Sequence, residues 1–191
     1  SPSNYHNPGE LLEQCVLKDD DIKIFSEHKL LYPKELRTNN NCPDGINVEY
    51  SNSMYPTAFL SNCQFEKPDL IIISHGGNSI MIEELMVDFL MEYELSIEAI
   101  LPSLISPLPY NDIIKKIELT PTIIFIEESP VSYGWSSEIV AYLSEIGLLD
   151  NKDIIRIGAE ELPIPSAIQL EEEVLPSKKN IFSRIQQLLN L

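Results

Sequence analysis

Basic residues are scarce in this chain, where 13 Lys and Arg stand against 30 Asp and Glu and the formal net charge is −17. A field of that sign repels the phosphate backbone of nucleic acids and the headgroups of anionic lipids, so neither is expected as a partner. No apolar run approaches the roughly 20 residues that a membrane-spanning helix needs. Composition therefore argues against two large classes of function, nucleic-acid binding and membrane insertion.

Cysteine is also rare, and Cys15, Cys42 and Cys63 stand at wide spacings that match no zinc-binding pattern. An odd number of thiols without a secretory signal indicates reduced cysteines in a cytoplasmic protein. The three histidines likewise lack the spacing of a metal site. Neither a G-x-S-x-G nucleophile elbow nor a P-loop is present. The residues thus show no complete active site.

The organised part of the chain is residues 69–191, where continuous apolar runs alternate with segments of helical periodicity. We predict strands at 69–74, 97–101, 122–126 and 154–158, and helices at 79–92, 110–117, 135–146, 166–175 and 180–191. Alternating strands and helices imply crossover connections and a parallel sheet. The fold class is therefore α/β, with three layers, a mostly parallel sheet and helices on both faces.

The first 68 residues are less regular. Residues 1–36 are predicted to form a helix over 10–18 and a short strand over 22–25 that leads into 26–32, a helix–strand pair too small to fold alone. Residues 37–68 are dense in turn formers and weak in periodicity, so we predict a linker with one short strand near 47–50.

The turn from Ser74 to Ser79 follows a predicted strand and opens a helix, and it contains Gly76 and Gly77. Free backbone N–H groups at such a place can hold an anion. Glycine is also needed simply to turn the chain from strand to helix, and the sequence matches no phosphate-binding motif. A tight turn is the simpler interpretation, and an anion site is the alternative.

Glu127 and Glu128 end a buried strand at the edge of the sheet where open α/β proteins bind ligands or partners. Paired carboxylates can do acid–base work. Neighbouring residues on a strand point to opposite faces, however, so these two cannot converge on one substrate atom. A polar strand end at an interface is the better interpretation.

The loop–helix junction at Tyr133, Gly134 and Trp135 places two large aromatic side chains together. They are either a staple packed on the core or anchors of an interface. His28, in a polar cluster after a predicted strand, is interpreted as a surface or interface histidine.

A family resemblance rests on the order of several segments rather than on one motif. These segments are 68–76, the strand with two glutamates at 122–128, the Gly-Trp-Ser-Ser-Glu-Ile run at 134–139, 155–159 and the Pro-x-Pro run at 162–165. The chain resembles the transketolase C-terminal domain. More narrowly, it resembles the beta subunit of the thiamine-diphosphate-dependent 2-oxo acid dehydrogenase component, of the pyruvate and branched-chain types.

The resemblance implies a particular division of the chain. Residues 1–36 would be the end of the preceding pyrimidine-binding domain, 37–68 the linker, and 69–191 the transketolase C-terminal-like domain. In the family, thiamine diphosphate and magnesium lie between other domains, so this chain is expected to hold no cofactor and no catalytic residue. It looks like a truncated beta subunit.

Partners also follow from the resemblance. They would be an alpha subunit or pyrophosphate-binding domain, a second beta subunit and the acyltransferase core of a 2-oxo acid dehydrogenase complex. Glu127, Glu128, Tyr133, Gly134, Trp135 and His28 are the expected interface residues.

A structural potassium ion is held by some family members at a helix and turn that Cys15, Asp19 and Asp21 match. The resemblance therefore implies half of a potassium site here.

Three hypotheses stay open. The chain is an inactive part of a thiamine-dependent enzyme, a free-standing assembly or regulatory module with the same fold, or a small-ligand-binding domain that uses the turn at Gly76 and Gly77.

Overall fold

A six-stranded sheet forms the centre of the protein, whose computed structural model describes residues 1–18, 20–62, 67–118 and 120–191. The strands are β1 (Asn47–Tyr50), β2 (Thr57–Ser61), β3 (Leu70–Ile73), β4 (Ile97–Pro102), β5 (Thr122–Pro130) and β6 (Asp153–Ala159). Their order is β1-β2-β4-β3-β5-β6. β2 is antiparallel to both of its neighbours, whereas β3 pairs in parallel with β4 and β5, and β5 pairs in parallel with β6. The predicted mostly parallel sheet is confirmed.

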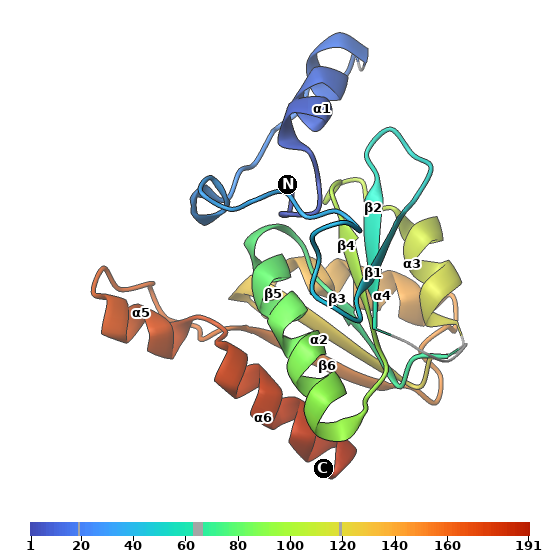
Figure 1. The fold of residues 1–191 in the computed structure, drawn as a ribbon, viewed down its shortest axis with the longest axis vertical. Helices are drawn as coiled ribbons and strands as arrows, with labels where there is room; N and C mark the ends of the chain where they lie inside the picture. The colour runs from blue at the N-terminus through green and yellow to red at the C-terminus, as the bar shows by residue number, and fades with distance from the viewer. Residues whose placement is uncertain (19, 63–66, 119) are drawn as a thin grey trace.

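Four of the helices of the described structure cover the two faces of this sheet (Figure 1). The helices are α1 (Pro8–Glu13), α2 (Ser79–Tyr93), α3 (Tyr110–Ile117), α4 (Trp135–Glu145), α5 (Ile168–Val174) and α6 (Lys178–Leu189), with short helical turns η1 (Gln14–Lys18), η2 (Lys29–Leu31) and η3 (Gly76–Asn78). Helices α2 and α6 cover one face, and α3 and α4 cover the other. The three-layer α/β class predicted from the sequence is therefore confirmed.

Strand β3 shows why this architecture forms. All four of its residues are buried, and successive side chains enter opposite faces of the sheet. Leu70 and Ile72 join the cluster under α2 and α6, while Ile71 and Ile73 join the cluster under α3 and α4. An apolar strand with no polar face is stable only when helices cover both sides of it.

Helix α2 presents its apolar residues at helical spacing to the sheet. Ile82, Leu85, Met86 and Phe89 are all fully buried. The ring of Phe89 stacks on Phe182 of α6, with 4.2 Å between ring centroids. These contacts join α2 and α6 into one layer.

The segment predicted as a linker, 37–68, differs from that prediction because it contains two strands of the sheet. The strand predicted near 47–50 is confirmed as β1, and β2 follows it and pairs with β4. Strand β2 is nearly all buried, with the sequence Thr-Ala-Phe-Leu-Ser. The sequence analysis did not predict β2, because a strand of five residues between prolines and other turn formers shows too little periodicity to detect.

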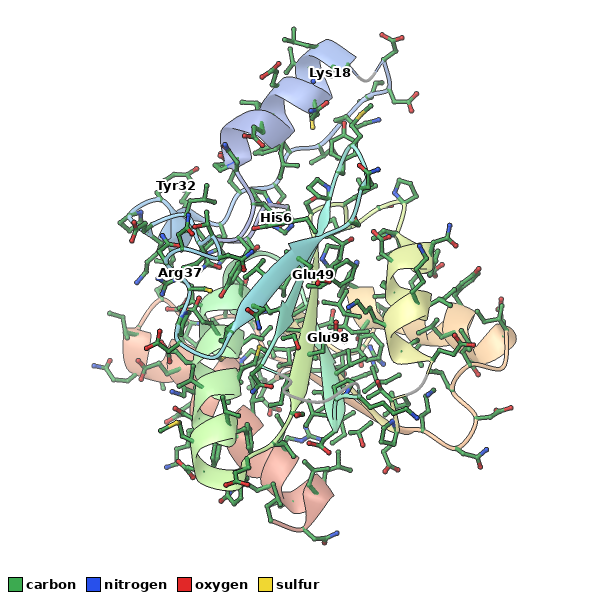
Figure 2. The ribbon with its side chains drawn as sticks, turned by 45° about the vertical axis from the view of Figure 1, so that its right-hand side comes forward. His6, Lys18, Tyr32, Arg37, Glu49 and Glu98 are labelled. Atoms are coloured by element: carbon green, nitrogen blue, oxygen red, sulfur yellow. The ribbon has the colours of Figure 1, made fainter. Side chains whose placement is uncertain are left out.

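One element predicted before residue 36, the strand over 22–25, is absent from the described structure. Residues 22–25 pair with no strand, and Ile22 and Ile24 are 99% and 94% exposed. The segment that follows contains the single helical turn η2. The helix predicted over 10–18 is present as α1 and η1, beginning at Pro8 with Asn7 as N-cap. It projects away from the sheet, and Figure 2 shows Lys18 at its far end.

The N-terminal residues are nevertheless fastened to the domain through Glu83 of α2. Tyr5 Oη donates to Glu83 Oε2 at 2.5 Å, and Arg37 Nη2 donates to Glu83 Oε1 at 2.7 Å. The amide of Arg37 also donates to the carbonyl of Asn4 at 2.7 Å. Burial, followed by the bond to Glu83, raises the pKa of Tyr5. Residues 2–6 are buried, and Figure 2 shows His6 and Arg37 in this region.

Within the described residues, no helix is both long and apolar enough to cross a bilayer.

The contribution of Asn62 to the stability of this fold can be tested. This residue is 2% exposed, its Nδ2 donates to the carbonyls of Met86 (2.9 Å) and Leu95 (3.3 Å), and its Oδ1 accepts from the amide of Ile97 at 2.6 Å. Asn62→Ala removes all three bonds, so we expect the free energy of unfolding in urea to fall by about 2 kcal/mol. Asn40→Ala, at an exposed turn, serves as the control. Equal effects of the two substitutions would contradict the role of Asn62.

His6 predicts a pH dependence. Burial lowers its pKa from 6.5 to about 4. As the pH falls, His6 therefore takes up a proton in the unfolded chain before it does so in the folded protein. The contribution of neutral His6 to the free energy of unfolding is complete above pH 6.5 and is lost as the pH falls from 6.5 to 4. Between pH 7 and pH 5 the protein should lose about 2 kcal/mol more unfolding free energy than the variant His6→Gln.

Urea unfolding of both proteins at the two pH values measures this difference. The other histidines are common to both, so their titration cancels in the comparison. An equal loss in the two proteins would contradict the assignment to His6.

Candidate functional site

The carboxyl edge of the sheet contains the point where the strand order reverses. From β3 the chain passes through η3 and α2 to one face, whereas from β5 it passes to α4 on the other face. The connections that follow the adjacent strands β3 and β5 therefore run to opposite faces of the sheet, which leaves a crevice between them. Open α/β sheets bind ligands at such a crevice. His28, Glu128 and the turn at Gly76 and Gly77 lie at this crevice.

A hollow of about 190 Å³ lies at this crevice. It is lined by Ser1, Ser26, Glu27, His28, His75, Gly76, Gly77 and Glu128. His28 Nε2 lies 3.0 Å from Glu128 Oε1, so the structure brings together two of the residues predicted from the sequence. His28 Nδ1 is buried and has no hydrogen-bond partner among the described residues.

Two different constraints require glycine at positions 76 and 77 in the turn after β3. Gly76 adopts φ +60°, in the left-handed region that favours glycine. At Gly77 a Cβ would lie 2.7 Å from the ring atoms of His28, so only glycine lets this ring approach the backbone. The tight turn expected from the sequence is confirmed, and the imidazole of His28 occupies the space over it.

Glu127 lies inside the protein at 1% exposure, in contrast to the half-exposed Glu128 beside it. Its carboxylate accepts from Ser129 Oγ at 2.7 Å, from the amide of Ser136 at 3.4 Å and from Ser136 Oγ. Arg156 Nη2 lies 3.8 Å from Glu127 Oε1. A buried carboxylate surrounded by donors in this way holds the start of α4 against the ends of β5 and β6.

Arg156 and Ser136 are neighbours of Glu127 that the sequence analysis did not single out as candidate site residues. Arg156 Nε donates to Ser136 Oγ at 2.7 Å, and its Nη2 donates to Ser137 Oγ at 2.5 Å and to the carbonyl of Val131. One signal was available, because Arg156 is the single basic residue within the apolar run of β6. A cation in a strand that is otherwise apolar requires an anionic partner nearby.

Gly134 packs directly on the Glu127 carboxylate. A Cβ there would lie 2.4 and 2.6 Å from the two carboxylate oxygens and 2.6 Å from the carbonyl of Pro130. Trp135, the first residue of α4, donates from Nε1 to the carbonyl of Ile105 at 3.2 Å and lies edge-on to His75, with 4.7 Å between ring centroids. Both residues therefore contribute to the interior packing of this edge.

Tyr133 is fully exposed and adopts φ 57°. Of the two aromatic residues at this junction, Trp135 packs inward as a staple would, and Tyr133 points into solvent. Within the described structure Glu127 and Gly134 pack internally. The interface role expected for Glu127, Glu128, Tyr133, Gly134, Trp135 and His28 stays a prediction.

The chemistry available here is limited. Glu127 and Glu128 point apart, as alternation along a strand requires, so no acid–base pair converges on one point. Burial lowers the pKa of His75, which favours its neutral form. The arrangement is suited to holding a turn in place, with one small hollow beside it.

The half-site for potassium is separate from this edge. Cys15 is half-buried in η1, and the exposed Asp21 lies 3.5 Å from Lys23 Nζ. Asp19 lies outside the described residues. Among the residues that are described, no group of three or more His, Cys, Asp or Glu is placed to hold a metal ion. The potassium half-site stays a prediction.

A three-layer α/β domain with a six-stranded sheet and an internally bonded carboxyl edge is thus the class of structure. The family described as "Transketolase, C-terminal domain" matches residues 62–181. The chain belongs to this family. The match begins at the end of β2, before the boundary at residue 69 that the sequence indicated.

Two relatives extend the match beyond the family domain. The mitochondrial beta subunit of the pyruvate dehydrogenase E1 component of Saccharomyces cerevisiae is 25% identical over 94% of this chain and 48% of its own length. The corresponding subunit of Bacillus subtilis is 26% identical over 98% of this chain and 54% of its own length. The chain therefore spans about half the length of these relatives.

A solved structure agrees on the fold. A split-gene transketolase, described as an inactive beta4 tetramer, superposes with a TM-score of 0.54 at 20% identity. The match covers 66% of this chain and 41% of that one.

Gly134→Ala tests the internal role of this edge. The added methyl group would displace the Glu127 carboxylate and the carbonyl of Pro130, so we expect the free energy of unfolding to fall by about 3 kcal/mol. At Gly9 in α1 the nearest atom to an added Cβ is 3.4 Å away, so Gly9→Ala is the matched control. Denaturant unfolding measures both, and near-equal stabilities would count against a tightly packed Gly134.

Proposed function

We propose that this chain is the C-terminal, assembly-supporting part of the beta subunit of a thiamine-diphosphate-dependent 2-oxo acid dehydrogenase. The complete enzyme would carry out the oxidative decarboxylation of a 2-oxo acid. The observation that carries the proposal is the extent of the match: two pyruvate dehydrogenase beta subunits align with 94% and 98% of this chain, well outside the family domain.

The way the first 41 residues meet the domain supports this reading. Glu83 of α2 accepts from both Tyr5 and Arg37, and Arg37 Nη1 donates to the carbonyl of Asn41 at 2.8 Å. These bonds tie the segment that precedes the family domain to its first long helix. We propose that residues 1–36 are the end of a pyrimidine-binding domain and that this clamp fixes it against the C-terminal domain.

Thiamine diphosphate needs magnesium, and magnesium takes oxygen ligands. The hollow at the carboxyl edge presents Glu128, whose carboxylate is already paired with His28, and the Glu127 carboxylate is enclosed by its own donors. Residues that converge on a metal are thus lacking there in the described structure. We therefore propose that these residues do not hold the cofactor and that the role of this chain in the complete enzyme is structural.

The proposed partners are an alpha subunit or pyrophosphate-binding domain, a second beta subunit and the acyltransferase core of the complex. The carboxyl edge is the surface that we assign to assembly, because Glu128, His28 and the fully exposed Tyr133 lie there.

A second candidate function is a free-standing module that binds a small ligand at the crevice. One observation favours it: the hollow beside Gly76 and Gly77 contains the buried, unpartnered Nδ1 of His28. Free-standing assembly without a ligand is the third reading of the same fold.

The intact mass of the endogenous protein, purified without denaturant, tests the proposal. We expect a polypeptide of about twice the length of this chain, because the chain spans 48% and 54% of its relatives. An alpha subunit should co-purify with it. Titration calorimetry of this chain alone with thiamine diphosphate and magnesium should show no binding.

Two outcomes would overturn it. An endogenous mass equal to this chain, with no co-purifying subunit, would favour the free-standing module. Saturable binding of thiamine diphosphate by this chain alone would contradict the structural role assigned here.

A further inference from the structure

An arm of the chain leaves the domain after β6 and returns before α6. It runs from Glu160 to Val174 and contains α5, which lies away from the sheet in Figure 1. The amide of Glu160 donates to the carbonyl of Val174 at 2.9 Å, which closes the base of the arm. Val174 is buried at 7% exposure, so the base is packed while the rest extends into solvent.

Four large apolar side chains are exposed along this arm. Leu162, Ile164, Ile168 and Leu170 are 61%, 58%, 67% and 51% exposed. Single exposed apolar residues are ordinary, but four within nine residues of one projecting segment form a surface that water covers poorly. Such a surface is typical of a docking site.

Two prolines prepare the first half of the arm for binding. Pro163 and Pro165 alternate with Leu162 and Ile164 and fix φ at two of the four positions. A segment held extended loses little conformational entropy when a partner orders it. The arm is therefore built to present its apolar side chains rather than to bury them within its own domain.

The charge of the arm selects the kind of partner. Glu160, Glu161, Glu171, Glu172 and Glu173 all belong to it, and no Lys or Arg lies between Arg156 and Lys178. Carboxylates that flank an apolar surface attract a partner carrying basic residues around an apolar strip and repel acidic ones.

Tyr133 extends this surface toward the carboxyl edge of the sheet. Ser132 Oγ donates to Glu161 Oε1, so the loop that carries Tyr133 is bonded to the arm. The tyrosine is fully exposed in a left-handed backbone conformation that is uncommon for a bulky residue. Exposed tyrosine is a common anchor of protein interfaces.

We propose that residues 160–173, together with Tyr133, form a docking surface for a protein partner that presents a basic amphipathic helix. This inference deepens the proposed function, because it rests on the assembly role and names the chemistry of one partner. A second copy of this chain fits less well, since each copy carries a net charge of −17 and would bring glutamates against glutamates.

The test uses the whole chain and a defined probe. The probe is a fluorescein-labelled amphipathic helical peptide of leucine and lysine, compared with a peptide in which glutamate replaces every lysine. Fluorescence anisotropy should show saturable binding of the lysine peptide only, weaker at high salt because part of the attraction is between charges.

The decisive comparison is between two double variants with equal change in charge. Glu172→Gln with Glu173→Gln, in the arm, should weaken binding about fivefold, since each exposed charge pair contributes modestly. Glu13→Gln with Glu49→Gln, at exposed positions in α1 and β1, should leave binding unchanged. Ile168→Ser should also weaken binding, and its thermal unfolding should match that of the unchanged protein because Ile168 is exposed.

Three results would overturn the inference. Equal weakening by both double variants would mean that the peptide responds only to net charge. No binding at all would remove the docking surface, and self-association in light scattering that Ile168→Ser abolishes would identify a second copy as its occupant. None of these results bears on the endogenous mass, so the proposed function can stand or fall separately.

Discussion

The structure depends on one constraint, which is that the central strands have no polar face. β3 and the first part of β5 are buried on both sides, so helices must cover the sheet from above and below. The crossover helices α2, α3 and α4, together with α6, provide that cover. They also cause the strand order to reverse between β3 and β5, which is why the crevice lies at this point of the carboxyl edge.

The polar residues at that edge are mostly bonded to one another. Glu127 sits among Ser129, Ser136 and Arg156, while Glu128 pairs with His28 from a distant part of the chain. Many enzymes of this architecture keep reactive groups at the same place. Here the groups fasten a turn, a helix and the N-terminal segment.

The proposals assign two surfaces of the described structure to partners. One is the carboxyl edge around Tyr133 and Glu128, and the other is the arm that carries α5. The bond from Ser132 to Glu161 makes them continuous. Binding in this family member would thus come from elements after β5 and β6, while the clamp on Glu83 fixes the segment before the domain.

The sequence by itself determined the layers of the domain and its family. Long apolar runs such as 70–73 and helices such as α2 carry their own periodicity, and local pattern is enough to place them. It also predicted that Glu127 and Glu128 point apart, because alternation is a property of any strand.

Only the tertiary structure decided the rest. β2 is too short to be predicted from its sequence pattern. It forms because it pairs with the edge of β4. Residues 22–25 have strand-like composition but no such edge, and they stay unpaired. That Arg156 meets Glu127, or that His28 covers Gly77, depends on contacts between residues far apart in the chain, which no local pattern encodes.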